Sequence, residues 1–220
     1  MTPLDAKPDL DVLAAALEGT FPARGEAPLA ITLLRLLAEG APVSTRALAH
    51  RSDRPADEVG RQLAAWPNVE RDGHGRVVAF SGLTLRPTLH TFAIGNQTLF
   101  TWCAWDTLFL PELLGLTARV RSACPATGQP VSLTVTPQSV QEVNPAGAVV
   151  SIVVPPSSDD IRSTFCCHVM FLASPKAGRA WTATRPNSVL LSLEQAHELG
   201  RRTNERFFAH TQSPTRGVTV

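Results

Sequence analysis

Residues 118–135 are the clearest indication of the fold class and read Ala118-Arg119-Val120-Arg121-Ser122-Ala123-Cys124-Pro125-Ala126-Thr127-Gly128-Gln129-Pro130-Val131-Ser132-Leu133-Thr134-Val135. Apolar and polar residues alternate over 118–122 and again over 131–135, which is the period of a β-strand with one buried face. The residues between them contain one glycine and two prolines, which favour a turn. The stretch therefore predicts two strands joined by a turn.

Further strands and helices are predicted on both sides of this stretch. A helix is expected from about Ser192 to Phe208, because Glu194 lies early in it and arginines lie late, which suits the helix dipole. The other expected elements are an apolar helix from about Trp102 to Leu110 that ends near Pro111, a strand from Val149, and a strand over 164–172. Residues 81–220 are thus predicted to form an α+β domain, with a mixed or antiparallel β-sheet core and flanking helices.

Residues 1–80 have a different pattern, in which helices precede a hairpin. After a short helical run over 10–17, an apolar helix stops at Gly40, Ser44 is a suitable N-cap for a second helix, and Pro55 begins a third. Two strand-like runs then flank Asp72-Gly73-His74-Gly75, a hairpin signal. Three helices followed by a hairpin predict an N-terminal domain that resembles a winged helix.

A winged helix suggests DNA binding through its third helix, but the charges disfavour that function here. The acidic residues Asp53, Asp57 and Glu58 lie among the arginines of this helix and its approach. The whole chain has 20 Lys and Arg against 19 Asp and Glu, a net charge of +1. Because such a balance attracts neither nucleic acid nor an anionic membrane, we expect neither partner.

The cysteines and the N-terminus predict a reduced, cytoplasmic protein. No run of residues is apolar enough for a membrane helix, and the first residues lack a secretory pattern. The four cysteines, two of them adjacent, do not have the spacing of a disulfide framework. The chain contains no tyrosine, so phenolic acid–base chemistry is excluded.

The first candidate for chemistry is the segment Trp102-Cys103-Ala104-Trp105-Asp106. Three residues apart on a helix, Cys103 and Asp106 would share one face, and an N-terminal helical turn would stabilise a thiolate at Cys103. In apolar surroundings Asp106 would hold a proton near neutral pH. The pair then offers a nucleophile and a general acid, although a buried cysteine beside a helix-capping aspartate is the commoner explanation of this spacing alone.

The second candidate is Phe165-Cys166-Cys167-His168. On a strand, neighbouring side chains point to opposite faces, so Cys166 is expected to face a pocket and Cys167 the apolar core. His168 is expected to be structural. Cys124, which lies in a turn without a CxxC partner, is also expected to be structural rather than part of a zinc site.

Several segments in order resemble the bacterial organomercurial lyase (alkylmercury lyase) family. They are Trp102 to Leu108, Ala118-Arg119-Val120, Cys124 to Val135, and Phe165 to Val169, and the likeness extends through most of 95–208. The resemblance implies protonolytic cleavage of the carbon–mercury bond of alkyl- and arylmercury compounds, which releases a hydrocarbon and mercury(II). It assigns Cys103, Asp106 and Cys166 as the catalytic residues. It also implies an N-terminal domain that is not used for DNA.

The resemblance sets further expectations for the site and its partners. Mercury(II) is soft, so Cys103 and Cys166 would bind it as thiolates, and Trp102, Trp105 and Phe165 would line the pocket and exclude water. Trp105 departs from the leucine expected at its position, which would alter the size of the pocket. No cofactor is expected; excess small thiol would release the product, with a possible hand-off to mercuric reductase.

Two alternatives compete with this prediction. A winged-helix, thiol-based and metal-responsive transcriptional regulator would sense a soft metal through Cys103, Cys166 and His168. A Cys-His-Asp hydrolase would need His168 hydrogen-bonded to a cysteine and an oxyanion-binding turn, and no glycine-rich turn lies beside Cys103 in the sequence.

Overall fold

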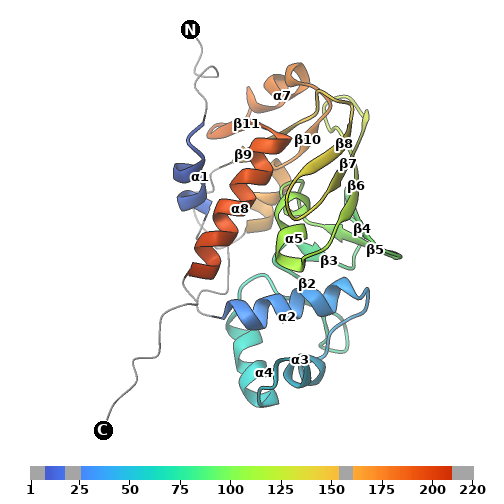
Figure 1. The fold of residues 1–220 in the computed structure, drawn as a ribbon, viewed down its shortest axis with the longest axis vertical. Coiled ribbons are helices and arrows are strands. Elements are labelled where there is room, and N and C mark those ends of the chain that lie inside the picture. The colour runs from blue at the N-terminus through green and yellow to red at the C-terminus, as the bar shows by residue number, and fades with distance from the viewer. Residues whose placement is uncertain (1–7, 18–25, 154–160, 210–220) are drawn as a thin grey trace.

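The computed structural model describes residues 8–17, 26–153 and 161–209 of the chain. Its fold is α+β, with helices packed around antiparallel sheets (Figure 1). The first four helices are α1 (Leu10–Leu17), α2 (Ala27–Ala38), α3 (Thr45–Ser52) and α4 (Ala56–Ala65). Ser44 caps α3 by accepting a hydrogen bond from the Ala47 N–H, as the sequence predicted. The helix α1 packs against α8 (Leu193–Ala209), apart from α2, α3 and α4.

The larger sheet has the strand order β1-β2-β3-β5-β4-β6-β7-β8, and every adjacent pair is antiparallel. The predicted pair of strands is confirmed as β6 (Ala118–Ala123) and β7 (Pro130–Val135), with Val120 opposite Leu133. The other strands are β1 (Glu70–Arg71), β2 (Val77–Phe80), β3 (Leu83–Thr84), β4 (His90–Ile94), β5 (Gln97–Thr101) and β8 (Val140–Asn144). Because β2 pairs with β3, the sheet continues from the helical N-terminal part into the rest of the chain.

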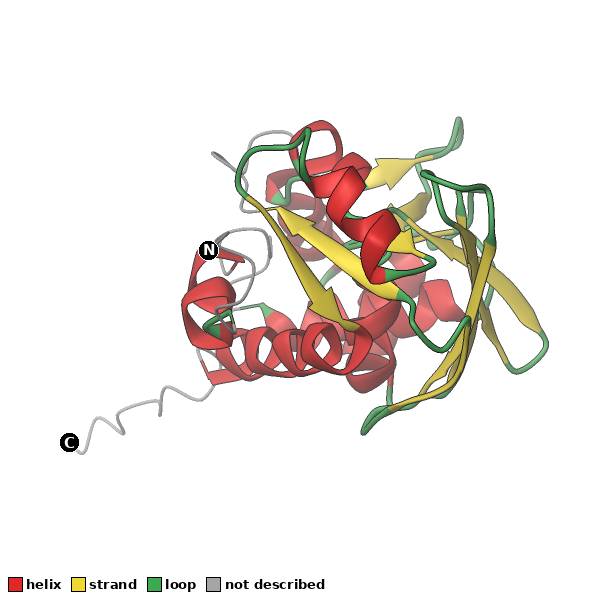
Figure 2. Cartoon of the chain, turned by 90° about the horizontal axis from the view of Figure 1, so that it is seen from above, coloured by secondary structure: helices red, strands yellow, loops and turns green. Residues whose placement is uncertain are grey.

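A smaller antiparallel sheet has the order β10-β9-β11, formed by β10 (Phe171–Leu172), β9 (Val149–Val153) and β11 (Ser188–Ser192). The remaining helices are α5 (Asp106–Leu114), α6 (Ile161–Thr164) and α7 (Pro175–Thr182), with a 3-10 turn over Cys166–His168. Most strands of the larger sheet stand at one side of the molecule, as Figure 2 shows from above. The helix α8 crosses the middle and contacts α1 and α5, so it joins the parts of the core (Figure 1).

Two predicted elements differ in the structure. The helix expected from Trp102 begins instead at Asp106, includes Pro111, and ends before Gly115, which adopts a left-handed φ of 71°. The strand expected over 164–172 is wrong: only Phe171 and Leu172 are β-structure, and the 3-10 turn precedes them. In both places a short apolar run is buried for tertiary reasons, and such runs do not reveal their secondary structure by periodicity.

Within the described residues, no helix has the length and apolar character that a membrane span requires.

Candidate active site

Three side chains that the sequence singled out meet in the interior. The Sγ atoms of Cys103 and Cys166 and a carboxylate oxygen of Asp106 all lie within 4.8 Å of one another. Cys103 is fully buried, and Asp106 and Cys166 are each 5% exposed. Two sulfurs and one carboxyl group at this spacing can hold a single soft metal atom with a proton donor beside it.

The loop from β5 to α5 sets the positions of Cys103 and Asp106. The Cys103 backbone N–H donates to Oδ2 of Asp106 at 2.7 Å, and Thr101 Oγ1 donates to the Cys103 carbonyl at 2.9 Å. Thr107 Oγ1 donates to the Ala104 carbonyl at 2.7 Å, which closes the turn onto the start of the helix. Because these bonds are buried, they fix the backbone of the turn and the direction of the carboxyl group.

A separate set of contacts brings Cys166 to this loop. The backbone N–H of Ala104 donates to the Val169 carbonyl at 3.1 Å, and that of Val169 donates to the Cys166 carbonyl at 3.3 Å. Ser151 Oγ donates to the carbonyl of His168 at 2.8 Å and so ties the 3-10 turn to β9. A backbone hydrogen bond between Ala104 and Val169 therefore joins the two cysteine-bearing segments.

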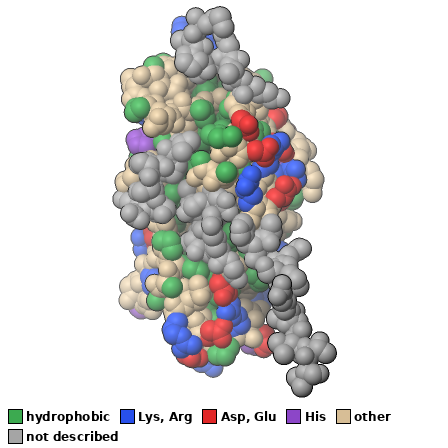
Figure 3. Space-filling model, turned by 90° about the vertical axis from the view of Figure 1, so that its left-hand side faces the viewer, with side chains coloured by type: hydrophobic (Ala, Val, Ile, Leu, Met, Phe, Trp, Pro, Cys, Tyr) green, Lys and Arg blue, Asp and Glu red, His purple; other side chains and the backbone are tan. Residues whose placement is uncertain are grey.

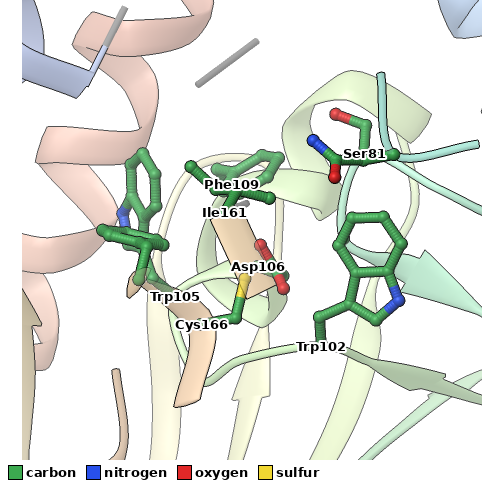
Figure 4. Close-up of a pocket in the computed structure, with 10 residues that line it drawn as sticks. Ser81, Trp102, Trp105, Asp106, Phe109, Ile161 and Cys166 are labelled. Carbon is green, nitrogen blue, oxygen red and sulfur yellow. The ribbon is translucent and has the colours of Figure 1, made fainter. Parts of the chain in front are cut away.

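A cavity opens onto this cluster (Figure 4). Asp106 and Cys166 line it, whereas Cys103 lies behind them with no exposed surface. The other lining residues form an apolar wall and a small polar rim: Trp102, Trp105, Phe109, Ile161 and Phe165, with Asn68, Ser81 and Gly82. The three aromatic residues expected at the pocket are thus present in its lining.

Trp105 is the most firmly held part of the wall. Its Nε1 donates to the Ala196 carbonyl of α8 at 3.0 Å. Its ring centroid lies 5.0 Å from that of Phe109 and 6.0 Å from that of Phe165. At the other side of the cavity, the guanidinium of Arg162 lies 5.4 Å from the centroid of the Trp102 ring, a cation–π contact.

Burial sets the protonation of the acid and of the inner thiol. It raises the pKa of Asp106 to about 7, against hydrogen bonds from Cys103 that lower it. Burial, together with Cys166 and the neighbouring carboxyl, also raises the pKa of the Cys103 thiol well above its ordinary value. The prediction that a helix N-terminus stabilises a thiolate at Cys103 is therefore wrong, because this residue lies in the turn before α5 and not in the first turn of the helix.

The remaining cysteines and His168 lie outside the cavity lining. Cys167 is exposed, and its Sγ donates to the Ser163 carbonyl at 2.8 Å, so the expected core position is wrong. The alternation argument failed because this segment is a 3-10 turn and not a strand. Cys124 is buried in the β6–β7 turn, where its carbonyl accepts from the Thr127 and Gly128 N–H groups.

Sequence reasoning missed the polar rim of the cavity. Ser81 and Gly82 form the two-residue connection between β2 and β3, and both have positive φ, at 46° and 92°. A serine–glycine pair between two apolar runs is a turn signal that could have located this connection. Nothing local to residues 68 or 81–82 indicates that they lie beside Asp106, since that depends on the tertiary fold.

Comparisons with known proteins agree with one another. Residues 83–205 match the family model described as alkylmercury lyase, and residues 10–81 match the helix-turn-helix domain of alkylmercury lyase. An alkylmercury lyase of Streptomyces lividans is 46% identical over 83% of this chain and 84% of its own. One of Pseudomonas putida is 47% identical over 79% of this chain and 82% of its own.

A solved structure gives the same picture for the fold. The chain resembles the mercury-bound form of MerB2 with a TM-score of 0.73 and 24% identity, covering 91% of this chain and 99% of that one. At this identity the likeness establishes the shared architecture of the two chains.

Proposed function

This chain belongs to the alkylmercury lyase family, enzymes that cleave the carbon–mercury bond, and we propose that Cys103, Asp106 and Cys166 carry out that cleavage. The observation that carries the proposal is the mutual approach of the two sulfurs and the carboxyl group within 4.8 Å at a buried cavity. The substrate is an organomercurial R–Hg–X. Mercury(II) prefers thiolate above other protein ligands, and a carboxyl group that titrates near 7 is suited to proton transfer at neutral pH.

The exposure of the two thiols supports an order of attack. Cys166 lines the cavity, whereas Cys103 is fully enclosed behind it. Cys166 therefore meets the substrate first. Its sulfur bonds to mercury, X leaves with the thiol proton as HX, and the product of this step is Cys166–S–Hg–R.

The second thiol then completes the reaction. Asp106 as a carboxylate accepts the proton of Cys103, whose thiol hydrogen-bonds to it. The Cys103 thiolate adds to mercury, which weakens the mercury–carbon bond and places negative charge on carbon. Asp106 delivers its proton to that carbon, R–H departs, and the carboxylate is regenerated. Mercury(II) is left bridging Cys103 and Cys166.

Product release returns both cysteines to their thiol form. Two small thiols exchange with Cys103 and Cys166, each giving up a proton and taking one bond to mercury. The mercury(II) leaves as a bis-thiolate, which is the form a mercuric reductase would receive. The reaction needs no further cofactor, because the two sulfurs and the carboxyl group supply every atom transferred.

We infer that the N-terminal part is a winged helix without a DNA-binding role. The helices α2, α3 and α4 followed by the β1–β2 hairpin support the winged-helix description. The basic residues of α4 and the loop before it are paired: Arg54, which precedes α4, with Glu26 and Glu58, and Arg61 of α4 with Asp57. On the face in Figure 3, acidic and basic side chains are interspersed. We place the enzyme in the cytoplasm, where small thiols are abundant.

The test is the release of benzene from phenylmercury, measured in the headspace with excess small thiol. The wild-type protein should release one benzene per phenylmercury. Cys103→Ser and Cys166→Ser should each abolish release, and Asp106→Asn should bind mercury without releasing hydrocarbon. Cys167→Ser is the matched control, since the exposed neighbour lies outside the cavity, and should retain most activity. Full turnover by Cys166→Ser would refute the assignment.

The order of attack has its own test, which is the mass of the protein after exposure to one equivalent of phenylmercury. Cys103→Ser should carry an intact phenylmercury group through Cys166. Cys166→Ser should label several-fold more slowly, because the remaining site thiol is enclosed. Faster labelling of Cys166→Ser than of Cys103→Ser would reverse the order. Both measurements should be made with Cys124 and Cys167 replaced by serine, so that only one thiol remains in each protein.

A further inference from the structure

We propose that Gly82 is a positioning residue for the catalytic acid: its missing side chain leaves the space that the Asp106 carboxyl group occupies. This inference rests on the proposed role of Asp106. A Cβ atom built on Gly82 would lie 2.5 Å from Cγ, 2.6 Å from Oδ1 and 2.9 Å from Cβ of Asp106. Carbon atoms do not approach so closely without displacement, so any side chain at position 82 would push the carboxyl group away.

The backbone holds Gly82 in this position from two directions. Phe80 pairs with Leu83 in antiparallel strands, so Ser81 and Gly82 are the two central residues of a tight hairpin. Both have positive φ, which is the signature of the turn type that fits the twist of paired strands. The Gly82 carbonyl also accepts the Trp102 N–H at 2.9 Å, which fastens the hairpin to the residue before Cys103.

The carboxyl group is equally constrained from the other side. Its Oδ2 accepts the Cys103 N–H at 2.7 Å, and Asp106 is the first residue of α5. The side chain is therefore clamped between the turn that carries Cys103 and the bare α-carbon of Gly82. A larger residue at 82 therefore displaces the acid: rotation about the Cα–Cβ bond of Asp106 moves Cγ and Oδ1 away, and a shift of a few tenths of an ångström at the start of α5 relieves the contact with Cβ. Both movements would take the carboxyl group away from the two cysteines.

Replacing Gly82 should impair the release of benzene but not the attachment of phenylmercury. Gly82→Ala should retain the attachment of phenylmercury to Cys166, with the rate of labelling within about threefold of wild type. Benzene release in a single turnover should fall on the order of tenfold to a hundredfold, since a displacement of about 1 Å in a reacting group is enough for such a loss. A purely structural defect would lower both steps together.

A second glycine provides a matched control for backbone strain. Gly115 has a φ of 71°, close to the 92° of Gly82, and a Cβ atom there would meet no atom within 4 Å. It ends the same helix that Asp106 begins. Gly115→Ala therefore imposes a comparable left-handed strain without touching the acid. It should lower the melting temperature as Gly82→Ala does, but leave benzene release within about threefold of wild type.

The experiment compares wild type, Gly82→Ala and Gly115→Ala for phenylmercury labelling by mass, benzene release, and thermal melting. Selective loss of release in Gly82→Ala supports the proposal, and release within threefold of wild type overturns it. If Gly82→Ala does not fold alone, it is combined with Asp106→Gly, which removes all three atoms that the new Cβ would meet: folding of the double variant supports the proposal, and failure of the double variant to fold overturns it. Absence of benzene from the wild type would refute the proposed function instead.

Discussion

The backbone N–H of Cys103 donates a 2.7 Å hydrogen bond to Oδ2 of Asp106, and both residues are enclosed. The thiol that is to lose a proton and the acid that is to carry it are thus held together within one turn. Burial places the pKa of Asp106 at about 7 and raises that of Cys103 well above its usual range. The pair therefore holds one proton over a wide range of pH above 7 and two below it.

This protonation predicts how benzene release depends on pH. The proposed transfer from Cys103 needs Asp106 as a carboxylate, so the single-turnover rate should rise about tenfold from pH 6 to pH 8 and then level off. The apparent pKa of about 7 belongs to the pair rather than to one residue. Rapid-quench measurement of benzene from phenylmercury-loaded protein checks this. A rate that falls across the same interval would mean that Asp106 must start the step protonated.

The same carboxyl group should make the folded protein less stable at high pH. Its pKa is raised from 3.8 to about 7 on folding, so the unfolded chain releases its proton first as pH rises. The contribution of this carboxyl group to the free energy of unfolding should therefore fall from about pH 4 to pH 7 and then remain constant. The full effect is about 4 kcal/mol for a shift of about three pKa units.

Asp106→Asn isolates this contribution. The variant cannot ionise, so its stability relative to wild type should be several kcal/mol better at pH 8 than at pH 4, as measured by urea unfolding at each pH. Asp57→Asn is the control, because that exposed carboxylate pairs with Arg61 on the surface. A pH-independent difference between Asp106→Asn and wild type would contradict the burial argument.

Much of this fold could be predicted because its signals are local. The alternation over 118–122 and 131–135 yields β6 and β7, and the cap at Ser44 marks the beginning of α3. The long helix α8 is predicted by its charge order, with Glu194 early and arginines late. Each depends on contacts between residues close in the chain, which sequence periodicity reports directly.

Other parts of the fold depend on burial that has no local period. The residues from Trp102 to Trp105 are apolar enough to suggest the start of a buried helix. In the structure they form a turn that points the Cys103 side chain into the interior. Alternation predicts that Cys166 and Cys167 lie on opposite faces of a strand; the 3-10 turn instead leaves Cys166 buried and Cys167 exposed. The predicted facing of Cys166 toward a pocket agreed with the structure although the argument for it was wrong.

The residues of the candidate site can be singled out from the sequence, but their assembly into one site is predicted only by the family resemblance. No rule of spacing brings Cys166 to Cys103, because the backbone bond from Ala104 to Val169 forms only in the folded chain. The contact between Gly82 and Asp106 could not be predicted either, because it also forms only in the folded chain. A glycine after a serine indicates a turn, but its contact with Asp106 is a property of two elements meeting in space.

A second buried titratable group predicts loss of stability in acid. His90 on β4 is 1% exposed, its Nδ1 lies 2.9 Å from Ser122 Oγ, and its Nε2 has no hydrogen-bond partner among the described residues. Burial lowers its pKa from 6.5 to about 4. The neutral imidazole thus contributes stability above pH 6.5 that is lost as pH falls toward 4, by about 3 kcal/mol in full.

His90→Gln should remove this dependence. As pH falls from 6.5 to 4, the wild type should therefore lose more unfolding free energy than the variant does. Chemical denaturation at each pH measures it. His74→Gln serves as the control, since that histidine is exposed in the β1–β2 turn. Parallel pH curves for His90→Gln and wild type would show that His90 is not the group that titrates.

Trp105 should set the size of the organic group that the enzyme accepts. Its ring lines the cavity, packs against Phe109 and Phe165, and is anchored to Ala196 through Nε1. Trp105→Leu removes much of this wall, so stability should fall by about 2–4 kcal/mol. The larger cavity should favour bulky arylmercurials: kcat/KM for naphthylmercury relative to methylmercury should rise at least fivefold.

Trp105→Phe is the control that separates ring size from the hydrogen bond, because it loses the bond to Ala196 but keeps an aromatic ring. It should leave the substrate preference near that of wild type. An unchanged ratio in Trp105→Leu would mean that the organic group lies against another part of the wall.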